Sequence, residues 1–233
     1  MNTDGGEIKI FGLDNKKEEK KIKQDVGVVL DDSFLSEYLN PTDINKIMKN
    51  FYKNWDEKLY FKYLEDFKLQ KDKMLKEFSS GMKMKLKIAT ALSHHPKLLI
   101  LDEPTAGLDP IARNEILDIF QDFIQDEENS ILVSSHITSD LEHIADYITF
   151  INEGEIILTK TRDELLDNYG IVKCSEEDFR KIDKKDYIKY KKNRYECDVL
   201  IENKFDFAKK YDFKVIDKPS IEDIMLIQIK GEK

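Results

Sequence analysis

Four aliphatic residues, Leu98 to Leu101, run directly into two adjacent carboxylates, Asp102 and Glu103. An uninterrupted apolar run of this length predicts a strand that is buried on both faces, as in the interior of a parallel sheet. In open α/β sheets, ligands bind at the carboxyl ends of the strands, so both acids are expected at a ligand-binding edge. Taken alone the pattern has low specificity, because acidic residues follow many buried strands.

Further strands and helices are expected on both sides of this run. Residues 7–11, 26–30 and 130–135 have the composition of short strands, and helices are expected to begin at Pro41, Ser79, Pro110 and about Ser139. A hairpin is expected over residues 147–159, with its turn at Glu153-Gly154. This alternation predicts an α/β fold built on a parallel sheet with right-handed crossovers.

Charge and composition exclude several classes of protein. The net charge is -9, which argues against a protein that gains its affinity from nucleic-acid phosphates. No run approaches the roughly 18 apolar residues of a membrane-spanning helix, and the start of the sequence lacks a secretion signal, so an intracellular protein is expected. Cys174 and Cys197 have neither CxxC spacing nor a nearby histidine, which predicts two free thiols.

Three further segments carry polar residues where chemistry is expected. Phe78-Ser79-Ser80-Gly81-Met82 precedes the Leu98 strand at the start of a helix, Thr105 to Asp109 follows it, and the next strand ends near His136. Unpaired amide groups and the positive end of the helix dipole make a helix start such as Ser79 an anion-binding position. The alternative for Ser79 is an ordinary helix cap, and His94 and His95 are expected to cap the end of the same helix.

In this order and spacing, the segments resemble those of the ATP-binding subunits of ABC transporters. Phe78 to Met82 is similar to the signature loop, Leu98 to Glu103 to the Walker B strand, Ala106 to Asp109 to the D-loop, and His136 to the switch histidine. The resemblance covers roughly residues 5–160. It implies a P-loop NTPase-like parallel-sheet core over residues 1–160, with a helical subdomain at about 33–95, followed by a small α+β appendage over residues 161–233.

The resemblance also implies a role for each polar residue. Glu103 would orient or deprotonate the water that attacks ATP, Asp102 would hold Mg²⁺ through water, and His136 would contact the γ-phosphate. A second group is expected to bind the nucleotide of the opposite subunit or to couple the two sites: Ser79, Ser80, Gly81 and Asp109. Asp31 takes the place of the family's Q-loop glutamine and is a further candidate ligand for Mg²⁺.

The sequence departs from the family in one essential motif. The phosphate-binding loop G-x-x-x-x-G-K-[ST] requires a glycine followed by lysine, and none of the nine glycines is followed by lysine. Two hypotheses explain this departure. The first is truncation, through a start site placed too late or a truncated gene. The second is that the chain is a non-hydrolysing remnant that regulates the transporter. The intact Ser79, Gly81, Asp102, Glu103 and His136 favour truncation. On either hypothesis this chain alone is expected to bind ATP poorly.

The resemblance implies two protein partners: a membrane-spanning transporter subunit and a second nucleotide-binding subunit. The branch that exports drugs and peptides is favoured by Met82-Lys83 and by the final segment from Pro219 to Ile224. The expected location is the cytoplasmic face of the cell membrane. Phe34 and Leu35 are expected to be exposed and to contact the membrane-spanning partner. ABC-type ATPases that act on ribosomes or DNA ends need duplicated cassettes or long insertions, for which 233 residues leave no room.

Overall fold

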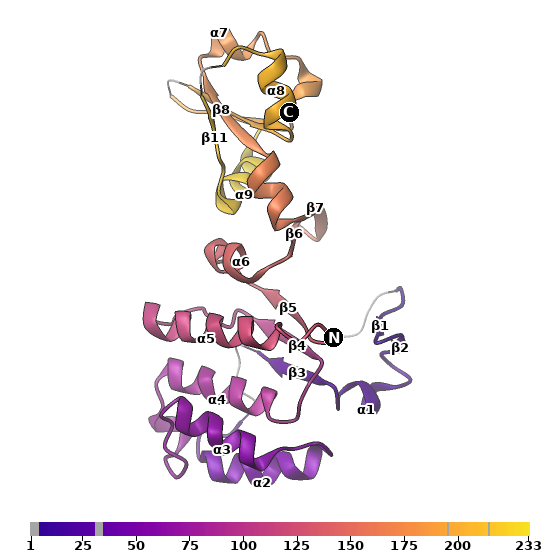
Figure 1. Ribbon diagram of the computed structural model, residues 1–233, viewed down its shortest axis with the longest axis vertical. Helices are drawn as coiled ribbons and strands as arrows, with labels where there is room; N and C mark the ends of the chain where they lie inside the picture. The colour runs from indigo at the N-terminus through magenta and orange to yellow at the C-terminus, as the bar shows by residue number, and fades with distance from the viewer. Residues whose placement is uncertain (1–4, 31–34, 195, 214) are drawn as a thin grey trace. The chain divides into compact units, whose positions relative to one another are not determined.

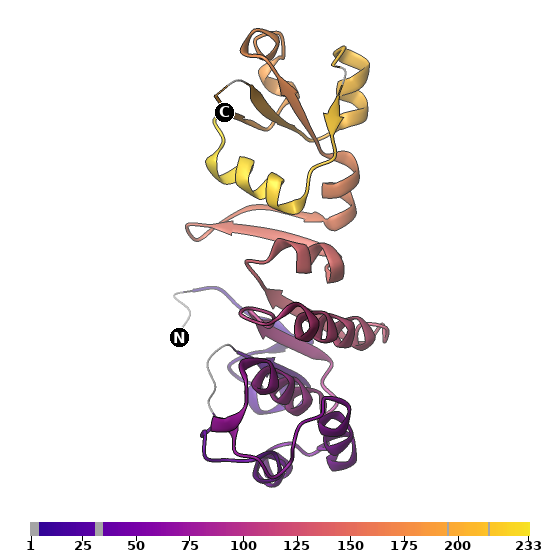
Figure 2. The ribbon, with the colours of Figure 1, turned by 90° about the vertical axis from the view of Figure 1, so that its left-hand side faces the viewer.

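The computed structural model describes residues 5–30, 35–194, 196–213 and 215–233 (Figures 1 and 2). The chain forms two compact units, residues 1–136 and 137–233. The domain boundary expected after residue 160 from the family resemblance stays a prediction. In the described part of the chain, no helix is both long enough and apolar enough to cross a membrane.

The first unit is built on a three-stranded parallel sheet with the order β3-β4-β5 (Figure 1). The strands are β3 (Val26–Val29), β4 (Leu98–Asp102) and β5 (Ser130–Ser134), and the two helices that precede and follow β4 are α4 (Ser80–Leu92) and α5 (Pro110–Phe123). The chain passes from β3 to β4 and then to β5 in the same direction along the sheet. When both connections are right-handed, as is the rule for parallel strands, their helices lie on one face of the sheet. The close approach of Gly27 to Ala91 and Pro96 shows that α4 packs on that face.

The opposite face of this sheet carries an exposed aliphatic row. Val28, Ile100 and Leu132 are neighbours in the strand register. Val28 is 49% exposed and Leu132 is 63% exposed, whereas Leu99 and Leu101 on the helix-covered face are nearly inaccessible to solvent. Parallel sheets are normally covered on both faces. The sheet of the first unit therefore has one covered face and one that lacks a cover among the described residues.

The strand expected at residues 7–11 is much shorter than predicted. Only β1 (Lys9–Ile10) pairs with β2 (Leu13–Asp14), and α1 (Glu19–Ile22) follows. Phe11 and Gly12 have φ values of 53° and 74°, so the chain turns back directly after Ile10. The alternating pattern of this segment is too short to distinguish a long strand from a tight hairpin.

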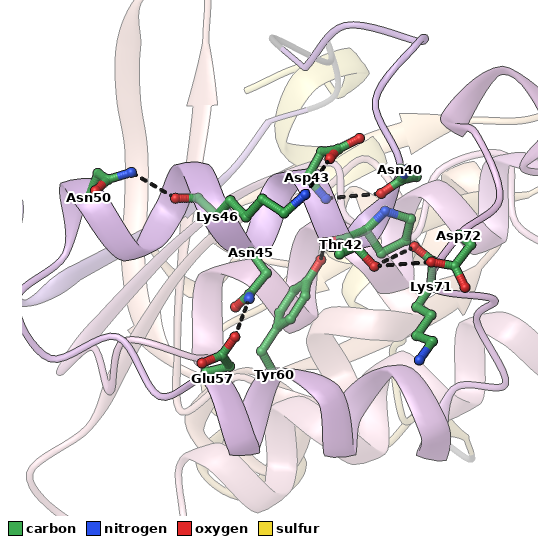
Figure 3. A network of polar contacts seen from close by, with 11 residues as sticks. Asn40, Thr42, Asp43, Asn45, Lys46, Asn50, Glu57, Tyr60, Lys71 and Asp72 are labelled. Atoms are coloured by element: carbon green, nitrogen blue, oxygen red, sulfur yellow. Dashed lines mark hydrogen bonds and ion pairs between the residues drawn. The ribbon is translucent and has the colours of Figure 1, made fainter.

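A helical subdomain is inserted between β3 and β4. It contains α2 (Pro41–Phe51), α3 (Glu57–Asp66) and the short 3₁₀ helix η1 (Leu75–Glu77), which pack with the first half of α4. The helix α2 begins at Pro41, as predicted, and Asn40 caps it: the side-chain oxygen of Asn40 accepts a hydrogen bond from the amide of Asp43 at 2.9 Å. Figure 3 shows how Asn45 and Tyr60 join α2 to α3: Asn45 donates to Glu57, and the Tyr60 hydroxyl donates to the carbonyl of Pro41.

His94 lies inside the first unit and does not cap α4, so the cap prediction is wrong. The residue is 1% exposed, its ring stacks on Tyr52 with centroids 3.8 Å apart, and Nε2 lies 3.2 Å from the carbonyl oxygen of Val26. Burial lowers the pKa of His94 to about 4. The imidazole is therefore neutral near pH 7 and gains nothing from the dipole of the helix.

The second unit combines a hairpin with a four-stranded antiparallel sheet. The hairpin consists of β6 (Tyr147–Asn152) and β7 (Glu155–Thr161), as predicted, and the sheet has the order β11 (Ile216–Asp217), β8 (Gly170–Cys174), β10 (Cys197–Ile201) and β9 (Lys189–Lys192). Its helices are α6 (Thr138–Ile144), the π-helical turn η2 (Glu164–Asn168), α7 (Glu176–Phe179), η3 (Lys184–Asp186), α8 (Lys204–Lys210) and α9 (Ile221–Lys230).

Alternate residues of β8 and β10 contribute their side chains to two separate hydrophobic cores. Ile171 and Leu200 pack with α9 and the hairpin, whereas Val172 and Val199 pack with Phe207 of α8. Alternation along a strand sends successive side chains to opposite faces, so one sheet supports both cores. A capping box at Ser220 begins α9. Both cysteines are free thiols, as predicted.

Candidate functional site at the ends of β4 and β5

The two carboxylates predicted to lie at the sheet edge do lie at the carboxyl end of β4. Asp102 is the last residue of β4 and is exposed, and the strand register places it beside Ser134, the last residue of β5. The Ser134 hydroxyl donates a hydrogen bond to Oδ1 of Asp102 at 2.5 Å. Among the described residues, Oδ2 of Asp102 receives no hydrogen bond, so this oxygen is available to a ligand.

Glu103 leaves the strand in an unusual backbone conformation. Its φ is +48°, in the left-handed region that residues other than glycine rarely adopt. The Glu103 amide still donates to the carbonyl of Ser134 at 3.1 Å, which keeps the residue attached to β5. The left-handed turn directs its carboxylate away from the path of the strand, and a non-glycine residue held this way costs on the order of 1–3 kcal/mol.

His136 contacts both carboxylate oxygens of Glu103. Its backbone amide donates to Oε1 at 3.0 Å, and its ring Nδ1 lies 2.7 Å from Oε2. An ionised carboxylate only accepts hydrogen bonds, so Nδ1 carries the proton and Nε2 remains to contact a further group. The side chain of Glu103 is 29% exposed and that of His136 is 70% exposed, so this pair can be reached from solvent.

The start of α4 is an exposed helix terminus. Ser79 is the N-cap, and its hydroxyl oxygen accepts a hydrogen bond from the Met82 amide at 3.2 Å. Ser79 and Ser80 are both exposed, and Gly81 is half-buried. The remaining amides of the first turn have no partner within the helix, and the dipole of a 13-residue helix favours an anion there.

Asp109 caps α5 from the segment that follows Glu103. Its Oδ1 accepts hydrogen bonds from the amides of Ile111 and Ala112, each at 3.0 Å. These bonds, that from Ala112 above all, hold the pKa of Asp109 below its usual value. A β-carbon placed on Gly81 would lie 3.6 Å from that of Ala112, so the start of α4 adjoins the first turn of α5.

The predicted site residues that the structure describes thus fall into two groups. Asp102, Glu103 and His136 come together at the ends of β4 and β5, and the Ser79–Gly81 segment lies beside the helix that Asp109 caps. Asp31 and Phe34 lie outside the described residues. Sequence reasoning missed Ser134, although its place directly before Ser135-His136 on the adjacent strand could have indicated a contact with Asp102.

The donor set at this edge suits a metal that retains most of its water. Among the described residues, no group of three or more His, Cys, Asp or Glu side chains is placed to hold a metal ion. Mg²⁺ takes one or two protein carboxylates and completes its octahedron with water and substrate phosphates. A single exposed carboxylate with a free oxygen, as at Asp102, fits Mg²⁺ that arrives together with a nucleotide.

Residues 1–106 match the family model described as ABC transporter. Among curated relatives, the lantibiotic transport ATP-binding protein SrtF of Streptococcus pyogenes is 55% identical over 89 residues, which is 38% of each chain. The bacitracin transport ATP-binding protein BcrA of Bacillus licheniformis is 37% identical over 158 residues, 65% of this chain and 50% of that protein. The chain therefore spans about half the length, or less, of these relatives.

Solved structures extend the similarity to the fold. A structure of the ATP-binding subunit of an ABC transporter is 26% identical and has a TM-score of 0.60 over 70% of this chain and 69% of the other. A dimeric post-hydrolysis state of the ATP-binding cassette MJ0796, bound to ADP and Pi, is 19% identical with a TM-score of 0.61 over 68% of this chain and 74% of the other, and it supports the fold alone. The predicted α/β, P-loop NTPase-like fold is confirmed. Over the matched residues, the chain is similar to ATP-binding subunits of ABC transporters.

Proposed function

We propose that this chain is part of an ATP-hydrolysing subunit that powers an ABC-type transporter. The observation that carries the proposal is the arrangement of Asp102, Glu103 and His136 at adjacent strand ends, in a chain similar to ATP-binding subunits. Glu103 is the proposed residue that orients or deprotonates the attacking water. A carboxylate held at both oxygens by one neighbour has a fixed direction, which suits this role.

Asp102 and His136 have complementary proposed roles beside Glu103. Asp102 would hold Mg²⁺ through water, with Oδ1 fixed by Ser134 and Oδ2 facing the metal's hydration shell. When bound, Mg²⁺ would neutralise phosphate charge. With Nδ1 committed to Glu103, His136 can present Nε2 to a γ-phosphate. Loss of that phosphate would remove the contact and leave His136 bound to Glu103 alone.

A second subunit would complete each nucleotide site. Ser79, Ser80 and Gly81 form an exposed helix start that suits a phosphate, and the proposed phosphate belongs to ATP held by the opposite subunit. The relative MJ0796 is described as dimeric in a post-hydrolysis state. Asp109, at the start of α5 next to this segment, is proposed to couple the two sites.

The phosphate-binding loop is proposed to come from a further segment. The printed sequence has no glycine followed by lysine, so its own residues do not form the G-x-x-x-x-G-K-[ST] cradle. The exposed row of Val28, Ile100 and Leu132 supports a missing cover on one face of the sheet. A strand, loop and helix that carry the cradle would supply both the cover and the phosphate ligands.

Export of a peptide antibiotic is the proposed task of the assembled transporter. The relatives SrtF and BcrA are described as lantibiotic and bacitracin transport proteins. A membrane-spanning subunit would dock on the α2–α3 subdomain and hold the chain at the cytoplasmic face of the membrane. Leu35 packs partly buried against the core of that subdomain, so its predicted exposure is wrong. The exposed ring of Tyr38 is the better contact candidate.

The role of Glu103 is tested in a chimera that joins the phosphate-loop segment of SrtF to this chain. Glu103→Gln should lower ATP turnover by about 10²–10⁴-fold, while ATP-dependent dimers accumulate in size-exclusion chromatography, since the binding groups remain. Glu127→Gln, at an exposed glutamate in the loop before β5, is the matched control and should leave turnover unchanged. Turnover of Glu103→Gln close to that of the parent chimera would refute the assignment.

A non-hydrolysing regulatory module is the second candidate, favoured by the absence of a Gly-Lys pair. The two candidates differ in what the chimera does. A restored phosphate loop should produce ATP hydrolysis if the ends of β4 and β5 are a working site. A chimera that binds ATP tightly but never hydrolyses it would favour the regulatory module. Micromolar ATP binding by the 233-residue chain alone, measured by calorimetry, would contradict the proposal that it needs a further segment.

A further inference from the structure

Two free cysteines of the second unit face each other across an antiparallel strand pair. Cys174 is the last residue of β8, Cys197 is the first residue of β10, and the strand register places them directly opposite one another. Both belong to the core cluster that contains Val172 and Val199, so their side chains lie on the same face of the sheet.

The spacing of the strands suits a covalent bond between them. Directly opposed residues of antiparallel strands have Cα atoms about 4.5–5.5 Å apart, depending on the hydrogen-bonding of the pair. Disulfides form at Cα separations of about 4.4–6.8 Å, so either type of pair is within range. We infer that Cys174 and Cys197 are a site of reversible oxidation, at which a small disulfide such as oxidised glutathione converts the two thiols into a cross-strand disulfide.

The reaction proceeds by two exchanges that balance without a further reactant. The thiolate of Cys174 attacks a sulfur of oxidised glutathione, and one glutathione leaves as a thiol. The thiolate of Cys197 then attacks the Cys174 sulfur of this mixed disulfide and releases the second glutathione. Two protein thiols are oxidised, one glutathione disulfide is reduced to two thiols, and the protons remaining from the cysteines pass to the departing thiolates.

The surroundings of the pair set the order and the rate of these steps. Cys174 is 8% exposed and Cys197 is fully buried, so the first attack comes from Cys174. Burial raises the pKa of the Cys174 thiol to about 11, so little thiolate is present near pH 7 and the reaction is slow. The position of the pair at the ends of both strands favours access, because local opening begins at such ends.

The simpler interpretation is that both residues only fill the core as small apolar side chains. That role predicts two thiols that react independently, each at a rate set by its own exposure. A disulfide site predicts instead that Cys197 attacks the mixed disulfide at Cys174 within the same chain. This intramolecular step should be faster than the reaction of Cys197 with a second molecule of oxidised glutathione. The segment closed by the bond, residues 174–197, contains α7, η3 and β9, so oxidation would tie this segment to the sheet.

The test exposes the 233-residue chain to oxidised glutathione near neutral pH and follows its intact mass. The wild type should lose two hydrogen atoms per chain, with both thiols disappearing together and no lasting glutathione adduct. Dithiothreitol should restore both. Cys197→Ala is the matched control and should stop at one stable adduct on Cys174. Cys174→Ala, which leaves only the fully buried thiol, should form its adduct at least several-fold more slowly.

Three results would overturn the inference. The first is a wild-type chain that carries two glutathione adducts, since the second thiol then fails to close on the first. The second is a disulfide that forms only after the chain is unfolded in denaturant. The third is a wild-type chain that keeps both thiols under conditions in which Cys197→Ala forms its adduct. Cys174 would then be reactive, and yet no disulfide would form between the two cysteines.

Discussion

Replacing His94 should remove a pH-dependent part of the stability of the first unit. The imidazole is buried, stacks on Tyr52 and contacts the carbonyl of Val26 through Nε2. Folding lowers its pKa from 6.5 to about 4, chiefly through burial. The unfolded chain therefore binds a proton between these two values that the folded chain does not bind. His94→Gln keeps an amide donor for Val26 and does not titrate.

The magnitude follows from the difference between the two pKa values. A group whose folded pKa is depressed contributes stability above the unfolded pKa, and this contribution is lost as the pH falls toward the folded pKa. Between the two values the loss is about 1.4 kcal/mol per pH unit. From about pH 7 to about pH 5, the free energy of unfolding of the wild type should fall by about 2 kcal/mol more than that of His94→Gln.

Trp55 provides the assay, since it is the only tryptophan and packs in the helical subdomain of the first unit. Urea unfolding followed by its fluorescence, at both pH values, gives the free energy of unfolding for each protein. Carboxylates titrate equally in both proteins, so the difference isolates His94. Gly5→Ala, at a residue in open space, is the control and should change in parallel with the wild type. If His94→Gln also changes in parallel with the wild type, to within about 0.5 kcal/mol, the reasoning is refuted.

Two further substitutions test the sheet of the first unit. Gly27→Ala should destabilise the first unit by about 1–3 kcal/mol, since the new β-carbon would lie 2.6 Å from Leu99 Cδ2. Gly5→Ala is the control, because Gly5 lies in open space. Equal urea midpoints for the two variants would contradict the packing argument. Leu132→Ser should cost under about 0.5 kcal/mol in this chain, where Leu132 is 63% exposed. In the chimera with the phosphate-loop segment it should cost at least about 1 kcal/mol, and an equally small cost there would show that the segment leaves this face open.

Sequence patterns were most reliable where the physical cause is local. The caps at Asn40 and Ser79 each depend on a hydrogen bond to an amide three residues ahead, and that spacing is visible in the sequence. The strand at Leu98 was predicted because an uninterrupted apolar run of this length is typical of a buried strand. These features need no knowledge of what packs against them.

Two of the failures depend on distant parts of the chain. The burial of His94 depends on the ring of Tyr52, 42 positions earlier, and no local pattern around the histidine reports it. Leu35 was expected to be exposed in the loop before α2, yet it packs against the core of the helical subdomain. The sequence placed Asp102 and Glu103 at a strand end and His136 near the next one, and their roles stay proposals. The contact between Ser134 and Asp102 depends on the register of two strands that lie far apart in the sequence.

The candidate site is best understood as a property of β4, α5 and β5 together. Each carboxylate at the end of β4 is held by a residue at the end of β5, 32 or 33 positions later in the chain. Ser134 is the last residue of β5 and His136 lies two residues beyond it, so the positions of both depend on the register of β5. A slip of β5 by one residue would turn both contacts away and release Asp102 and Glu103 at once. The length of the loop after α5 matters less, because residues 125–129 can change in number without moving this register, whereas any change within β5 acts on both carboxylates.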